Sequence, residues 1–318
     1  MSALERIMVV LEQEPWRNAA LRRGVELARR SGAELRLCIF AHDPMIVAYG
    51  DDLEEGIRRA AMSHFIDSRM RSLAMEAAVI AETGVRVECE VLWAPRPHQS
   101  IIARCIDLKP HLVIKCVGSS SQALRPLDWK LLRLIPADLM LVRESSPLQP
   151  QRIVSAIDVC NSQMHPRPLN EALVRSALRL ARYAAAELHL AHVLPYIPAG
   201  EMVDRKLRQA YECKVAEDLE AFRAFAADHG VPPDRLHALS GDSAQSLARY
   251  ILRSGADMVA LGSVYRSAWD RFMMGSTAEG LLADLHCDVL MVKEPGFATA
   301  LASHVDLVGW QRTLQRAS

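Results

Sequence analysis

One loop of the sequence carries residue types that suit the binding of an anion. Residues 262–277 read GSVYRSAWDRFMMGST and lie between an apolar run and a helical pattern. Gly262 and Gly275 bracket the loop, and Ser276 and Thr277 follow the second glycine. Glycine-flanked loops between a strand and a helix can present backbone N–H groups and a helix N-terminus to an anion. The loop is therefore a candidate phosphate site; the other interpretation is a connection that only carries arginines.

No other pattern predicts catalysis or metal binding. His189 and His192 lie in an expected strand, where their odd spacing places them on opposite faces, so they cannot share a metal ion. The segment SGDSAQS at 240–246 is better explained as a turn and helix cap, with Asp242 or Ser243 before the helix. The sequence has no nucleophile elbow, no Walker-type phosphate loop and no dinucleotide fingerprint. We expect no catalytic residue and no structural metal.

Composition predicts a globular chain of two domains. The 318 residues are 50% hydrophobic and 24% charged, with a formal net charge of zero. This length suits two domains of roughly 150 residues. The neutral balance gives no excess of positive charge that would attract nucleic acid. No apolar stretch is long enough to span a membrane, and the N-terminus shows no signal-peptide pattern. Seven scattered cysteines without a C-x-x-C pair suit a reducing compartment, so we expect a cytoplasmic protein.

Several short sequence segments occur twice along the chain, in the same order. LARRSGAELRL at 27–37 matches LARYAAAELHL at 180–190 without a gap. QSIIARCIDLKPHLVIK at 99–115 parallels QSLARYILRSGADMVAL at 245–261. The segment ESSPLQPQ at 144–151 has the composition of a short linker. The repeat predicts domains at 1–145 and 151–295, followed by a C-terminal extension, 296–318, that has no counterpart.

Strand-like and helix-like periods alternate within each copy. In the second copy the expected strands are 152–157, 187–193, 234–239, 257–262 and 288–293. Several of them are apolar on both faces, which is typical of a parallel sheet covered by helices on both sides. We therefore predict an α/β fold of two tandem doubly wound domains, each with a parallel five-stranded sheet. Ligands bind such sheets beyond the C-terminal ends of the strands.

These features resemble the universal stress protein family, whose fold is adenine nucleotide alpha hydrolase-like. Nucleotide-binding members carry G-x2-G-x9-G-(S/T) after the fourth strand. Gly262, Gly275 and Ser276 reproduce that spacing, with Tyr265 in place of the second glycine. The resemblance covers 5–144 and 151–294 as a tandem pair.

The resemblance implies an adenine nucleotide, ATP (with Mg²⁺) or AMP, in the second domain. Asp158, preceded by Ala156, would contact a ribose hydroxyl, and backbone groups near Val193 would meet the adenine edge. Arg266 could add a charge-assisted contact, whereas Tyr265 could stack on a ligand, fill the pocket or turn outward. The residues expected around the phosphates are Gly262, Gly275, Ser276 and Thr277.

The first domain departs from this pattern and is predicted to be degenerate, without a phosphate loop. Arg125 and Pro126 fall opposite Gly275 and Ser276, and proline lacks the N–H group that an anion site would use. Glu12 stands opposite Asp158, and Lys115 stands opposite a leucine of the second copy. Either Lys115 and Glu12 belong to a different ligand pocket, or the lysine is paired in a structural domain; we favour the second interpretation.

The resemblance implies a stress-response protein that acts as a ligand-dependent regulatory module. It further implies an intrachain pseudo-dimer in which 138–143 and 288–293 pair near a twofold axis. Homo-oligomerisation stays open, because the sequence identifies no surface for it. Two alternatives remain: a scaffold or a protein for apolar, lipid-like ligands without nucleotide, and a slow ATPase, for which Asp270 and Arg271 are the nearby candidates.

Overall fold

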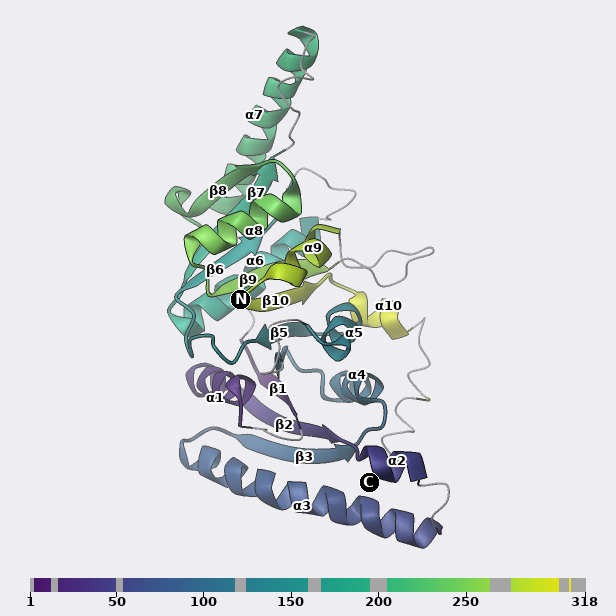
Figure 1. Cartoon of the computed structure of the whole chain (residues 1–318). Helices are drawn as coiled ribbons and strands as arrows, with labels where there is room; N and C mark the ends of the chain where they lie inside the picture. The colour runs from purple at the N-terminus through teal and green to yellow at the C-terminus, as the bar shows by residue number, and fades with distance from the viewer. Residues whose placement is uncertain are drawn as a thin grey trace. The chain divides into compact units, whose positions relative to one another are not determined.

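The computed structural model describes residues 3–12, 17–49, 54–117, 124–159, 167–194, 205–263, 276–302 and 309 (Figure 1). The chain divides into two compact units. One unit, here the first domain, comprises Ser2–Leu148 together with Gly296–Ser318, and the other, the second domain, comprises Gln149–Pro295. The C-terminal extension thus groups with the first domain, where its helix α10 (Phe297–Ala302) buries Phe297 and Leu301.

The first domain has a five-stranded parallel sheet in the order β3-β2-β1-β4-β5. Its strands are β1 (Arg6–Leu11), β2 (Glu34–Ala41), β3 (Val87–Trp93), β4 (Leu112–Cys116) and β5 (Asp138–Val142). Its remaining helices are α1 (Ala19–Ser31), α2 (Pro44–Tyr49), α3 (Glu55–Glu82), α4 (Pro97–Leu108) and α5 (Pro126–Leu134).

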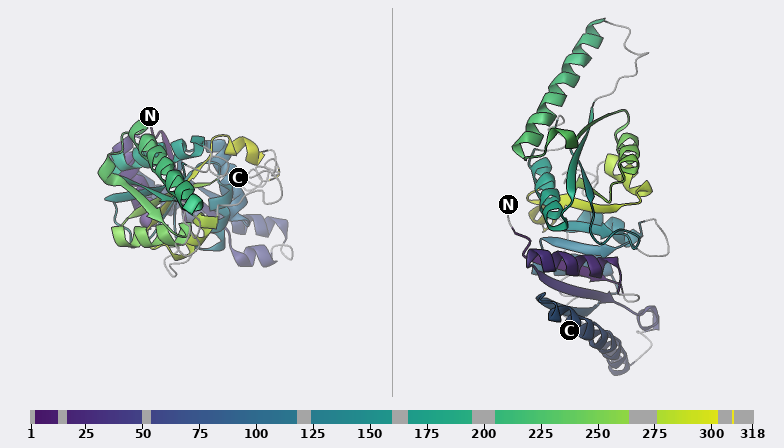
Figure 2. Two further views of the ribbon diagram at one scale, coloured as in Figure 1. Left: turned by 90° about the horizontal axis from the view of Figure 1, so that it is seen from above. Right: turned by 90° about the vertical axis from the view of Figure 1, so that its left-hand side faces the viewer.

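The second domain repeats this arrangement, with parallel strands in the order β8-β7-β6-β9-β10. Its strands are β6 (Arg152–Ala156), β7 (Glu187–Leu194), β8 (Leu236–Ser240), β9 (Met258–Ser263) and β10 (Asp288–Lys293). Its helices are α6 (Arg167–Ala184), α7 (Arg205–Asp228), α8 (Ser243–Ser254) and α9 (Ser276–Asp284). The right-hand view of Figure 2 shows α6 and α7 on one face of this sheet and α8 and α9 on the other.

Burial along the strands explains the layered core. Every residue of β4 and of β10 is buried, as expected for strands covered by helices on both faces. The predicted α/β class with parallel strands is confirmed. Several expected strand boundaries in the second domain differ by one residue. The largest difference is at β8, which begins at Leu236 and not at residue 234, because a 3-10 turn occupies Pro233–Arg235. Pro232 and Pro233 lack the N–H groups that a strand ladder needs.

Candidate functional site

Three strands of the second domain end at the same edge of its sheet. The parallel register pairs Ala156 of β6 with Ala191 of β7, and Ser155 of β6 with Ala260 of β9. Parallel neighbours finish side by side, so the segments that follow these pairs lie at the carboxyl edge. Asp158, Val193 and Gly262 therefore lie at one edge, where sheets of this kind bind ligands.

Asp158 is held at this edge by an asparagine of α6. The Asn170 amide Nδ2 donates a hydrogen bond to the Asp158 carbonyl at 2.6 Å, and the Asp158 N–H donates to Asn170 Oδ1 at 3.3 Å. Asn170 is 4% exposed, whereas Asp158 is half-buried. The pair of bonds fixes the backbone where the chain leaves β6 and leaves the carboxylate at the edge.

Sequence reasoning missed Asn170, although a signal for it existed. It is a polar residue within the apolar face of α6, between Leu169 and Leu173, both of which are buried. A buried amide at such a position must find hydrogen-bond partners, and the two groups of one peptide backbone satisfy it.

His192, next to Val193, ties the second strand to the first. Its Nδ1 lies 3.1 Å from the carbonyl oxygen of Ile157, and because a carbonyl only accepts, Nδ1 carries the proton. The ring packs against Phe222 of α7, with a centroid distance of 5.4 Å. His192 thus has a structural place in the domain, and Val193 beyond it is half-buried.

Gly262 is needed for packing against α6. A Cβ atom at this position would lie 2.9 Å from Cδ2 of Leu169, closer than carbon atoms can approach. Leu169 is 1% exposed and cannot move aside freely. The close approach of α6 therefore accounts for this glycine without reference to a ligand.

The remaining residues of the predicted site divide into two groups. Tyr265, Arg266 and Gly275 lie outside the described residues. Ser276 and Thr277 begin α9, two residues earlier than the sequence pattern suggested. The helix N-terminus thus follows Gly275 directly, and its first N–H groups have no partner within the helix, as at every helix N-terminus.

In the first domain the corresponding helix N-terminus is occupied by the chain's own carboxylate. Helix α5 begins at Pro126, and Asp128 Oδ2 accepts a hydrogen bond from the Arg125 N–H at 2.8 Å. Asp128 Oδ1 lies 2.9 Å from Lys115 Nζ, which also donates to the Cys116 carbonyl at 2.9 Å. Lys115 is 2% exposed and Asp128 is fully buried.

Glu12 completes this cluster of charges. Its Oε1 lies 3.1 Å from Arg125 Nη1 and 3.6 Å from Lys115 Nζ. The two cations and two carboxylates neutralise one another, which supports the paired-lysine interpretation. In the aligned positions of the second domain, Leu261 stands for Lys115 and Ala278 for Asp128.

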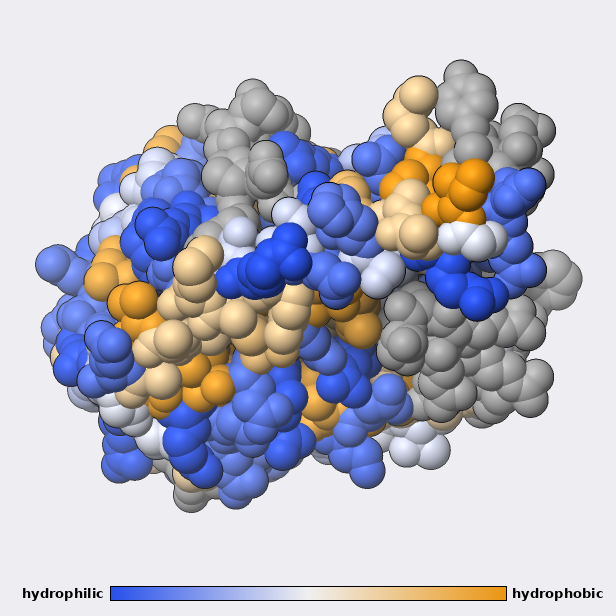
Figure 3. All heavy atoms as spheres, turned by 90° about the horizontal axis from the view of Figure 1, so that it is seen from below, coloured by the Kyte–Doolittle hydropathy of each residue, from blue (hydrophilic) through white to orange (hydrophobic). Residues whose placement is uncertain are grey.

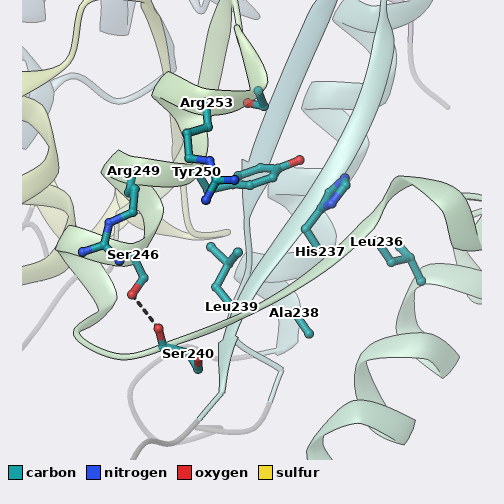
Figure 4. Close-up of a pocket in the computed structure, with 10 residues that line it drawn as sticks. Leu236, His237, Ala238, Leu239, Ser240, Ser246, Arg249, Tyr250 and Arg253 are labelled. Carbon is teal, nitrogen blue, oxygen red and sulfur yellow. Dashed lines mark hydrogen bonds between the residues drawn. The ribbon is translucent and has the colours of Figure 1, made fainter.

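A groove between β8 and α8 was not anticipated from the sequence. It has a volume of about 640 Å3 and is lined by all of β8 and by one face of α8, with Arg249 and Arg253 at its rim (Figure 4). The Ser246 hydroxyl donates to the Ser240 carbonyl at 2.8 Å and closes one end. The Tyr250 ring packs on His237 with a centroid distance of 4.7 Å.

His237 also forms a pair with a second histidine, His189, beneath the groove. Its Nε2 lies 2.9 Å from Nδ1 of His189, and the two rings stack. Burial is the main cause that lowers the pKa of both imidazoles below the ordinary value, and burial raises the pKa of the Tyr250 hydroxyl. Both rings are neutral, and one N–H group joins them in an N–H···N hydrogen bond. Such a bond suits a structural contact between β7 and β8.

The described parts of the chain contain neither a metal-type cluster nor a membrane-spanning helix. Within those ranges, no three histidine, cysteine or acidic side chains come together as a metal site would require. No described helix combines the length and apolar character needed to cross a bilayer.

Comparison with known proteins agrees with these features. A sequence profile of the universal stress protein family matches residues 150–293. Universal stress protein E of Escherichia coli K12 is 24% identical over 310 residues, which cover 94% of this chain and 97% of that protein. The universal stress protein E homolog of Haemophilus influenzae is 23% identical over 303 residues, 91% of this chain and 97% of its own.

Solved structures extend the similarity to the whole fold. A functionally unknown protein from Pseudomonas aeruginosa PAO1 superposes with a TM-score of 0.72 at 25% identity, covering 95% of this chain and 96% of its own. A universal stress protein from Archaeoglobus fulgidus gives a TM-score of 0.61 at 14% identity over 91% and 98% of the two chains, which shows the fold alone. Residues 150–293 therefore belong to the universal stress protein family, and the chain as a whole is a homologue of the family's tandem type.

Proposed function

We propose that the second domain binds an adenine nucleotide, ATP with Mg²⁺ or AMP, and that the protein acts as a ligand-dependent module of a cytoplasmic stress response. The site comprises residues at the carboxyl edge of the second sheet and at the start of α9. Membership of the family supports the proposal, as does the position of Asp158 at the end of β6.

The nucleoside would lie over the ends of β6 and β7. The Asp158 carboxylate can accept hydrogen bonds from ribose hydroxyls, and Asn170 holds its backbone in place before any ligand arrives. Preorganisation of this kind reduces the entropy lost on binding. Backbone groups near Val193 would meet the adenine edge, beside the half-buried Ala156.

The phosphates would lie at the N-terminus of α9, where N–H groups and the helix dipole favour negative charge. One observation carries this step. The third residue of α5 is Asp128, whose carboxylate occupies that helix N-terminus, whereas the third residue of α9 is Ala278, which carries no charge. Gly275, Ser276 and Thr277 would present the N–H groups, and Arg266 would pair with a phosphate oxygen.

Isothermal titration calorimetry with Mg-ATP and with AMP tests the proposal. Gly275→Glu places a carboxylate and a side chain where phosphate would lie, so it should abolish the binding that wild type shows. Gly56→Glu is the matched control, because Gly56 lies in the exposed first turn of α3 with nothing within 4 Å of an added Cβ atom. Equal affinities for wild type and Gly275→Glu would refute the site.

A second candidate function is favoured by the packing of Leu169 on Gly262. If that glycine serves only the contact with α6, the protein is a scaffold without nucleotide. The absence of both heat and any rise in melting temperature with ATP and AMP would select this candidate.

A further inference from the structure

Helix α3 is apolar on two opposite sides. Its inner side buries Leu73, Ala77 and Ile80 in the first domain, where the helix packs against β3. The C-terminal half of its outer side is also apolar, with Met75 67% exposed and Val79 57% exposed. A surface helix normally has one apolar stripe, and a second stripe calls for a second partner.

The outer stripe consists of Ala74, Met75, Ala78 and Val79, all exposed. Met75 and Ala78 are three residues apart, and Ala74–Ala78 and Met75–Val79 are four apart, so these side chains lie together on one face of the helix. Figure 3 views the side on which α3 lies and shows a band of apolar residues bordered by polar ones. The small alanines beside the larger Met75 and Val79 leave room for another helix to approach.

Opposite charges stand at the two ends of the stripe. Arg71 lies one turn before Met75, and Glu82 lies one turn after Ala78. Both are exposed, and neither side chain makes an ion pair or hydrogen bond with any part of the chain that the structure describes. Their charges are therefore available to a partner.

The order of residues along the stripe is self-complementary. Arg71 and Glu82, Ala74 and Val79, and Met75 and Ala78 are three pairs centred on the same point of the helix, between Glu76 and Ala77. An antiparallel second copy of α3, related by a twofold axis through that point, would place each large side chain opposite a small one. The same axis would place each Arg71 opposite a Glu82, as an isologous interface requires.

We propose that this α3 stripe is the surface through which two copies of the chain form a homodimer. The apolar contacts supply the affinity, and the two Arg71–Glu82 pairs fix the antiparallel register, since exposed ion pairs contribute more to specificity than to affinity. An anionic membrane fits the surface less well, because a membrane-surface helix carries a row of basic residues and this stripe has one cation and one anion.

Sedimentation equilibrium of the full chain over a range of concentrations tests the dimer. Wild type should show a concentration-dependent dimer, and Met75→Glu should leave a monomer. Leu252→Glu is the matched control, because Leu252 is a 75% exposed apolar residue on α8 in the other domain, and it should leave the dimer unchanged. Unchanged melting temperatures would show that each variant is folded.

A charge exchange tests the register. Arg71→Glu and Glu82→Arg alone each create two like-charge contacts per dimer and should raise the dissociation constant by about tenfold. The double variant restores opposite charges and should return to within about threefold of wild type. A wild type that stays monomeric, a dimer that survives Met75→Glu, or a double variant as weak as the singles would overturn the proposal.

Discussion

At the scale of single residues, the two domains differ at one buried pair. Lys115 and Asp128 form an ion pair in the first domain, and the second domain has Leu261 and Ala278 in their places. Both versions leave the core without an uncompensated charge. In the first domain the Asp128 carboxylate compensates the lysine, which explains how Lys115 can lie within the fully buried strand β4.

This coupling can be measured by unfolding the protein in urea. Lys115→Leu leaves the Asp128 carboxylate buried without its cation and should destabilise the first domain by about 3 kcal/mol. Lys115→Leu with Asp128→Asn removes the second charge but keeps an oxygen for the Arg125 N–H, so most of the loss should be recovered. A double variant less stable than Lys115→Leu alone would contradict the coupling.

Residues could be assigned from the sequence where their role follows from residue type and position in the chain. Residues whose role depends on partners in the folded structure could not. The position of Asp158 just beyond the first strand of the second domain and the helix cap at Asp242 could be predicted, because strands and caps follow local rules. The clamp by Asn170, the contact of Leu169 with Gly262 and the partner of Lys115 depend on chain segments brought together only by folding.

At the scale of elements, the contact between β7 and β8 depends on two neutral histidines. His189 and His237 face each other, with Glu187 on one side and Arg152, Arg235 and Tyr250 around them. Burial lowers both pKa values, Arg152 lowers them further, and Glu187 partly opposes this for His189. Protonation would bring two cations together at the edge of the sheet.

The stability of the second domain should therefore fall in acid. Because the folded-state pKa values lie below the ordinary 6.5, the unfolded chain takes up protons first as the pH drops. The stabilisation is complete above pH 6.5 and is lost as the pH falls through the folded-state values. His237→Phe keeps a ring against Tyr250 and should make the decline of unfolding free energy shallower. An equal decline in the variant and in wild type would exclude the histidine pair as its cause.

The element pattern itself was largely predictable, because apolar periods and internal repetition report on strands and helices directly. The groove beside β8 was not, since it arises from the spacing between a strand and a helix that no local pattern encodes. The role of α3 was missed for a related reason. Its outer stripe is apparent only once burial distinguishes its inner side from its outer side.

At the scale of the whole molecule, one chain carries two versions of the same fold with different carboxyl edges. In the first domain, the N-terminus of α5 and the carboxyl ends of β1 and β4 carry a cluster of ion pairs. Its members are Glu12, Lys115, Arg125 and Asp128. In the second, Ala278 takes the position of Asp128, and the acid in the first turn of α9 is Glu279, one residue later. Because of this asymmetry, we propose that a chain with two similar domains binds one nucleotide.

Equilibrium dialysis of the full-length protein against saturating radiolabelled ATP and Mg²⁺ measures this stoichiometry. We expect one nucleotide bound per chain. Two nucleotides per chain would mean that the charged cluster of the first domain yields to a ligand, and none would mean that the edge of the second domain is a structural remnant. Either result would be incompatible with a single nucleotide site in the second domain.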